Sequence, residues 1–179
     1  MKPIFLLLLI PLTLFTPFAA FSQNFFETIS LVDDKVQILV PKEWAPMSDQ
    51  LWAAKYPGRT MPMLALTDEN GEVDLIADLT QQPATAAQIA DFKAFQIQQL
   101  QSSRPDLEFL SEGIKDIHGR PVGYFKFLSR AVDQKVFNYY FFTVVDGKIM
   151  LFTFNCLKSL KRAWERSADR IMASLFVKD

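Results

Sequence analysis

The chain contains one histidine and one cysteine, the side chains that most often supply acid–base or nucleophilic chemistry near neutral pH. His118 lies in a His-Gly-Arg-Pro stretch between two predicted strands, which is typical of an exposed turn. Cys156 ends an apolar run that starts at Ile149, so we expect it to pack as a small buried hydrophobic group. No serine or cysteine stands in a nucleophile-elbow context, and no glycine-rich phosphate loop occurs. The sequence therefore predicts no catalytic residue, and we expect the protein not to be an enzyme.

Acidic side chains are densest between Asp68 and Asp78. Calcium takes six to eight oxygen ligands, and its best-known loop has glycine at the sixth position. Here Gly71 is the fourth residue of the segment, and Asn70-Gly71 is a strong signal for a tight hairpin turn. We interpret the segment as a hairpin tip, with weak cation binding as the alternative, and expect neither a metal site nor a cofactor.

The last predicted helix has a basic face, but Glu165 and Asp169 lie between its positive charges. The whole chain has 19 Lys and Arg against 20 Asp and Glu, a net charge of −1. A solvated helix face explains this pattern better than binding to phosphate or anionic lipid. We expect no nucleic-acid partner. The basic residues are Lys158, Lys161, Arg162, Arg166 and Arg170.

The segment from Pro41 to Met63 is rich in proline, methionine and large aromatic residues. Such side chains on irregular chain often form adaptable contact surfaces. The other interpretation is that they cap one edge of the core. The candidate partner-contact residues are Trp44, Met47, Trp52, Tyr56 and Met61.

Several elements must position these residues. Residues 26–31 and 36–40 predict a hairpin, and Ser48 is a candidate cap for a short helix through Ala54. Residues 63–67 and 72–80 predict a second hairpin, whose second strand alternates so that the face with Asp74 and Asp78 is expected to be wet. An amphipathic helix is predicted from Thr85 to about Ser102.

The sequence from about residue 107 onward predicts four strands and a terminal helix. The strands span about 107–117, 122–132, 136–145 and 148–156, and the third is apolar on both faces, so it must be central and covered on both sides. The terminal helix is predicted from Leu157 to Phe176. The fold class is α+β: an antiparallel sheet flanked by helices, with three layers if the two long helices take opposite faces.

Residues 1–22 have the features of a secretory signal peptide: one charge at Lys2, a short apolar stretch and small residues at the end. The best cleavage site follows Ser22, which leaves a single domain of residues 23–179 in the periplasm or outside the cell. A retained membrane anchor is the alternative, but Pro11 and Pro17 interrupt the apolar stretch, and a span needs about 20 apolar residues. We expect no stable membrane span after cleavage.

The run Val36-Gln-Ile-Leu-Val-Pro41-Lys-Glu-Trp44 resembles the opening of the PsbP-like and DcrB-like families, in which a strand is followed by Pro-x-x-Trp. The order of the remaining elements is also similar, over about residues 25 to 177. The resemblance implies an α/β/α sandwich in an exported bacterial protein without established enzymatic activity, and some relatives act as adaptors or assembly factors. It supplies no catalytic residue, and the lipoprotein cysteine of many members is missing here.

The expected function is that of an exported, non-enzymatic binding or assembly protein with an envelope or secreted protein as its partner. The alternative is a protein that binds a small apolar ligand or lipid in a cavity between the aromatic-rich sheet and a helix.

Overall fold

The computed structural model describes residues 25–131 and 133–178. Its strands and helices are β1 (Phe26–Leu31), β2 (Val36–Pro41), β3 (Ala45–Pro46), α1 (Asp49–Lys55), β4 (Leu64–Thr67), β5 (Val73–Pro83), α2 (Ile89–Ser103), β6 (Glu108–Ile117), β7 (Arg120–Arg130), β8 (Lys135–Val145), β9 (Lys148–Leu157), α3 (Lys161–Ala173) and β10 (Phe176–Val177).

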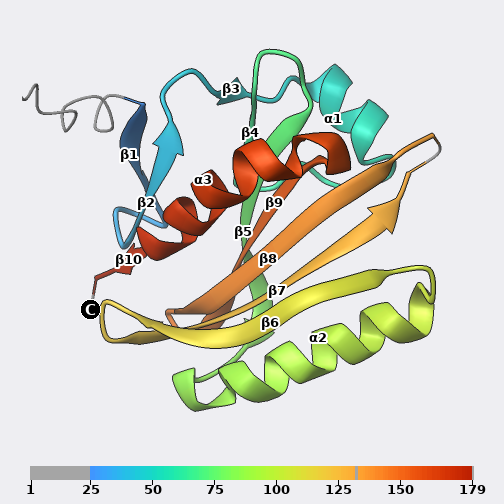
Figure 1. Ribbon diagram of the computed structural model, residues 1–179. Coiled ribbons are helices and arrows are strands. Elements are labelled where there is room, and N and C mark those ends of the chain that lie inside the picture. The colour runs from blue at the N-terminus through green and yellow to red at the C-terminus, as the bar shows by residue number, and fades with distance from the viewer. Residues whose placement is uncertain (1–24, 132, 179) are drawn as a thin grey trace, which may run out of the picture.

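An antiparallel sheet in the order β3-β4-β5-β9-β8-β7-β6 forms the middle layer (Figure 1). Tight turns join its long strands. In the turn from β8 to β9, Asp146 and Gly147 have φ angles of 49° and 71°. Two successive positive φ angles are characteristic of a type I′ turn, whose twist matches that of the two strands it joins. Glycine adopts the second positive angle without strain. Strand β8 lies between β7 and β9, which confirms the predicted central strand.

Helices cover this sheet on both faces. Successive side chains of a strand point to opposite faces, and in β8 Phe141 packs in the core cluster of α3 whereas Phe142 packs in the cluster of α2. The helix α1 lies on the α2 side, since Trp52 packs with Ala65 and Ile76. The predicted three-layer α/β/α sandwich is confirmed.

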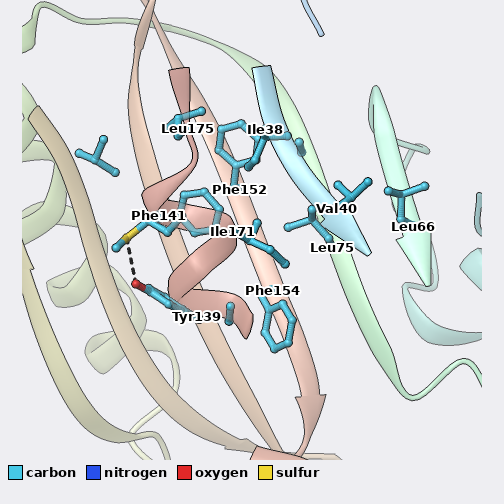
Figure 2. Packing of buried hydrophobic residues seen from close by; sticks show 14 of the residues in the cluster. Ile38, Val40, Leu66, Leu75, Tyr139, Phe141, Phe152, Phe154, Ile171 and Leu175 are labelled. Carbon is cyan, nitrogen blue, oxygen red and sulfur yellow. Dashed lines mark hydrogen bonds between the residues drawn. The ribbon is translucent and has the colours of Figure 1, made fainter. Parts of the chain in front are cut away.

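The core under α3 is aromatic, and Ile38 and Val40 also belong to it (Figure 2). These two residues lie in a small second sheet, β1-β2-β10. The rings of Phe141 and Phe152 stack with their centroids 4.9 Å apart. The Tyr139 hydroxyl donates to the Met172 sulfur at 2.9 Å. Strand β2 lies beside α3, so its residues Ile38 and Val40 close the layer next to the helix.

The motif Pro41-x-x-Trp44 has a structural explanation in this layer. Pro41 ends β2, and its carbonyl accepts from the Trp44 N–H at 3.1 Å, which turns the chain over the core. The Trp44 ring then packs between Phe154 and Trp164, with centroid distances of 6.2 Å and 5.4 Å. The motif therefore joins the small sheet, the large sheet and α3.

The last helix is shorter than its periodicity predicts. It ends at Ala173, and residues 176–177 form β10 against β2, so the prediction of helix up to Phe176 is wrong at that end. Leu175 is buried and continues the apolar period, so the pattern does not mark the stop. The stop is tertiary: the Ser174 hydroxyl accepts from the Leu39 N–H at 2.9 Å, and the chain then pairs with β2.

The start of α2 differs less from its prediction. A turn of 3-10 helix over Ala86–Gln88 precedes it, and the Gln88 side-chain oxygen accepts from the Thr85 N–H at 2.9 Å. This bond satisfies one of the backbone donors left free at a helix start.

The expected signal peptide, residues 1–22, lies outside the described residues. Within the part of the chain that the structure describes, no helix combines the length and the hydrophobicity needed to cross a bilayer.

Candidate functional site

A groove of about 700 Å³ opens on the α2 side of the sheet, between the end of α1, the end of α2 and the β7–β8 hairpin. Figure 1 shows α1 and the tip of this hairpin at the same end of the sheet. The groove is a gap in the helical layer, where the sheet face carries a row of polar side chains flanked by the apolar Val136 and Leu157. Its polar lining side chains are Lys55, Tyr56, Glu72, Asp74, Arg104, Ser129, Gln134, Asn138 and Asn155.

The helix α1 brings Lys55 and Tyr56 to the groove. Ser48 caps the helix by accepting from the Leu51 N–H at 3.2 Å, as the sequence predicts. Trp52 fixes the other end, since it is buried under the helix and its indole N–H donates to the Arg59 carbonyl at 2.9 Å. The Tyr56 ring packs on Trp52 with centroids 4.4 Å apart, which holds the hydroxyl over the sheet.

Asp74 is the charged group at the floor of the groove, and it is only 1% exposed. Its carboxylate accepts from the Lys55 ammonium at 2.5 Å, from the Thr67 hydroxyl at 2.8 Å and from the Tyr56 hydroxyl at 3.1 Å. The expectation that this face of β5 is wet is therefore wrong at Asp74, because α1 covers it, and right at the exposed Asp78. Burial, and then the charge of Asp74, raises the pKa of the Tyr56 hydroxyl above its usual range, so this hydroxyl remains a donor.

A row of polar side chains crosses three strands beside this ion pair. Asn155 on β9 lies opposite Asp74 on β5 and opposite Asn138 on β8, so the three share one face. The Asn155 amide donates to the Tyr56 hydroxyl at 3.1 Å, and the Asn138 amide donates to Ser129 and to the Val136 carbonyl. The Asn155 amide oxygen is buried and has no hydrogen-bond partner among the described residues. Buried polar atoms without a partner are rare in folded proteins.

The structure divides the five candidate contact residues into two groups. Trp44, Met47 and Trp52 are buried, whereas Tyr56 and Met61 are partly exposed. The structure thus gives the three buried side chains a packing role, and it brings Tyr56 to the groove. The exposed Met63 lies close to Met61 in the chain and extends the accessible part of this segment.

The remaining candidates of the sequence have structural roles. His118 is exposed in its turn, with its ring against Phe176, and Cys156 is buried, as predicted. Asp68 accepts from the backbone N–H groups of Glu72 and Val73, which confirms the hairpin tip. The described residues contain no cluster of three or more His, Cys, Asp and Glu side chains that could hold a metal ion.

The acidic residues of α3 point toward the sheet rather than along the basic face. Lys126 of β7 donates to Glu165 at 3.1 Å and to Asp169 at 2.9 Å. Lys161 donates to Glu165 at 2.6 Å. Arg162 and Arg166 are exposed to solvent, and the solvated helix face stays the interpretation of this pattern.

Sequence reasoning missed Lys55, Asp74 and Asn155 as members of one site. One signal was available for Asn155, a side chain with a polar amide inside the apolar run from Ile149 to Cys156. The lateral alignment of Asp74 with Asn155 depends on the register of β5 against β9, which no local pattern encodes.

No protein-family model matches the sequence, and no curated protein matches it either. Solved structures do match. Cyanobacterial PsbP (CyanoP) from Synechocystis sp. has a TM-score of 0.61 at 13% identity, over 86% of this chain and 92% of that one. LpqN of Mycobacterium tuberculosis, involved in cell envelope biogenesis, has 0.53 at 12%, over 86% and 91%. The Ran-binding protein Mog1p of Saccharomyces cerevisiae has 0.51 at 10%, over 86% and 96%.

Identities this low establish the fold and nothing finer. The matches extend over most of this chain and nearly all of each of the other chains. The resemblance carried by Pro41-x-x-Trp44 is thereby confirmed at the level of architecture, and the chain has the PsbP-like fold.

Proposed function

We propose that this protein is an exported, non-enzymatic binding domain that docks onto a protein of the cell envelope or a secreted protein. The observation that carries the proposal is the accessible methionine segment beside the groove. Met63 is 46% exposed and Met61 is partly exposed, on chain that forms neither helix nor strand between α1 and β4. Methionine side chains are flexible and polarizable, so they suit a contact surface that adapts to a partner.

The fold relatives support a binding role. Mog1p binds Ran, and LpqN is involved in cell envelope biogenesis. Both have nearly the whole sandwich in common with this chain. One architecture hosts many functions, so the relatives support binding in general and identify no partner.

The protonated state of the Cys156 thiol also favours a non-catalytic role. Burial, and after it the nearby Glu165 carboxylate, raises the pKa of the Cys156 thiol to about 12, and the side chain is 1% exposed. Only the thiolate reacts, so Cys156 is inert near neutral pH.

Site-specific photo-crosslinking in intact cells tests the docking surface. A photoreactive residue replaces Met63 in one variant and Phe95 on α2, which is 49% exposed, in the matched control. We expect one partner to crosslink through position 63 and not through position 95, because only the first lies on the methionine segment. We expect the double substitution Met61→Ser and Met63→Ser to weaken that partner's binding at least about tenfold, the loss of about 1.4 kcal/mol. The same crosslinks from both positions, or none, would contradict the proposal.

A second candidate function has its own observation. A hollow of about 300 Å³ lies between β1, the end of β2 and α3, and Phe26, Trp44 and Trp164 line it. This volume is at the lower end of small-molecule pockets. Glu43, Ser167 and Arg170 also line it, so the occupant that its walls favour is a small apolar ligand with a polar end. Native mass spectrometry of the purified protein tests this. Trp164→Ala should abolish any bound mass, and a spectrum of the bare chain alone would count against this function.

A further inference from the structure

We propose that the groove between α1 and α2 binds a neutral polyhydroxylated ligand, such as a saccharide unit, through side chains centred on Asn155. This inference goes beyond protein docking and does not depend on it. The docking segment contains Met61 and Met63, which do not line the groove, whereas the saccharide site consists of its polar floor.

The first step is the unsatisfied amide. The Asn155 side chain is 8% exposed, its nitrogen donates to Tyr56, and its oxygen has no partner among the described residues. An unpaired buried polar atom costs about 1–3 kcal/mol. Turning the amide over would leave the nitrogen unpaired instead. The oxygen is shielded from solvent, so a ligand reaches it once the amide turns toward the groove. A hydroxyl group donates and accepts, so it then satisfies either orientation, and a polyol carries several such groups.

The second step is the charge of the floor. Lys55 neutralises Asp74, and Arg104 pairs with Asp106 through two bonds of 2.9 Å and 3.0 Å. Glu72 lies at the exposed rim, where water screens its charge. A floor of compensated charges gives no net attraction to an anion or a cation. It favours a ligand that is neutral and rich in hydrogen-bonding groups.

The third step is the number of available groups and the space. The ammonium of Lys55 donates to the Gly71 carbonyl at 2.7 Å and to Asp74, which leaves one of its three protons for a ligand. Ser129 and Gln134 line the opposite wall on the hairpin. A volume of about 700 Å³ accommodates one or two sugar rings and lies inside the range of small-molecule sites. Sites built to bond hydroxyl groups reject analogues that lack them.

The test is a titration of the mature protein, followed by NMR of backbone and side-chain amides. The probes are glucose, N-acetylglucosamine and maltotriose, with citrate and spermidine as charged comparisons and cyclohexanol as the apolar one. We expect at least one sugar to shift the side-chain amide signals of Asn155 and Gln134, with little effect of the charged or apolar probes. Asn155→Leu should weaken that binding at least tenfold and leave the free energy of unfolding equal or higher, because it removes the unpaired atom.

The matched control is Thr153→Val, a loss of a polar group on the same strand and face but outside the groove, and it should keep sugar binding. Gln134→Ala changes an exposed hairpin residue, so it tests the groove even if the change at Asn155 prevents folding. Shifts by no sugar, sugar shifts that persist in both groove variants, or tighter binding of citrate or spermidine would each overturn the proposal. The Met61→Ser and Met63→Ser protein should still bind sugar, which separates this site from the docking surface.

Discussion

Asp74 combines two properties that oppose each other, a full charge and nearly complete burial. Hydrogen bonds from the Lys55 ammonium, the Thr67 hydroxyl and the Tyr56 hydroxyl stabilise the buried carboxylate. Removing one partner of a buried ion pair leaves the other uncompensated, but Lys55 is 26% exposed in its side chain and can turn toward water. We therefore expect Asp74→Ala to lower the free energy of unfolding by about 2–3 kcal/mol in urea denaturation.

Asp78 is the control for this change, because it lies on the same face of β5 and is exposed. Asp78→Ala should change the free energy of unfolding by less than about 0.5 kcal/mol. Equal losses at both positions would mean that the network around Asp74 contributes no special stability.

Tyr139 makes the free energy of unfolding fall as the pH rises in the alkaline range. Burial, and after it the negative charge of Asp169, raises the pKa of its hydroxyl above the ordinary value of 10.0. Because the folded pKa is the higher one, the unfolded chain loses this proton first, and stability falls as the pH rises above about 10. We expect Tyr139→Phe to make this fall shallower by up to about 1.4 kcal/mol per pH unit, in unfolding curves measured at several alkaline pH values.

At neutral pH the same substitution should cost about 1 kcal/mol, since it removes the bond to the Met172 sulfur and the interaction of the hydroxyl with the Asp169 carboxylate. An unchanged alkaline slope would show that Tyr139 titrates alike in the folded and unfolded states.

The elements themselves were largely predictable because their signals are local. Alternation in β8, the Asn70-Gly71 turn and the Ser48 cap each depend on a few neighbouring residues, and each element forms where expected. The end of α3 and the burial of Asp74 were not predictable, because β2 and α1 decide them through contacts distant in sequence. The same reason hid the groove, which exists only where α1 and α2 leave part of one sheet face uncovered.

The contact between α2 and β7 depends on Gly123. A Cβ atom at this position would lie 2.5 Å from the Phe142 ring and 3.0 Å from the Ile89 side chain, so either the ring or the helix would have to move. We expect Gly123→Ala to lower the free energy of unfolding by about 1–3 kcal/mol, measured by urea denaturation. Combining it with Phe142→Leu should cost less than the sum of the two single changes, because the smaller side chain relieves the clash. Strict additivity would contradict this assignment of the contact.

At the scale of the whole molecule, the two faces of the sheet are covered to different extents. The face under α3 is closed by an aromatic core and the small sheet, whereas the other face is closed under α2 and open at the groove. On the open part the unpaired Asn155 oxygen costs stability, and the closed core offsets that cost.

Cys156 tests whether the sheet beside the groove is part of one cooperative unit. Its thiol lies on β9 between β5 and β8 and packs in the core under α3, so a reagent reaches it only when these strands separate. We expect labelling of the native protein by a thiol reagent to require the same free energy as global unfolding in urea, to within about 1 kcal/mol. A Ser111→Cys substitution on the exposed edge strand β6, made in a Cys156→Ala background, should label at the rate of a free thiol. Labelling of Cys156 at a markedly lower free energy would show instead that the groove end opens locally, so that ligand entry and sheet stability are linked there.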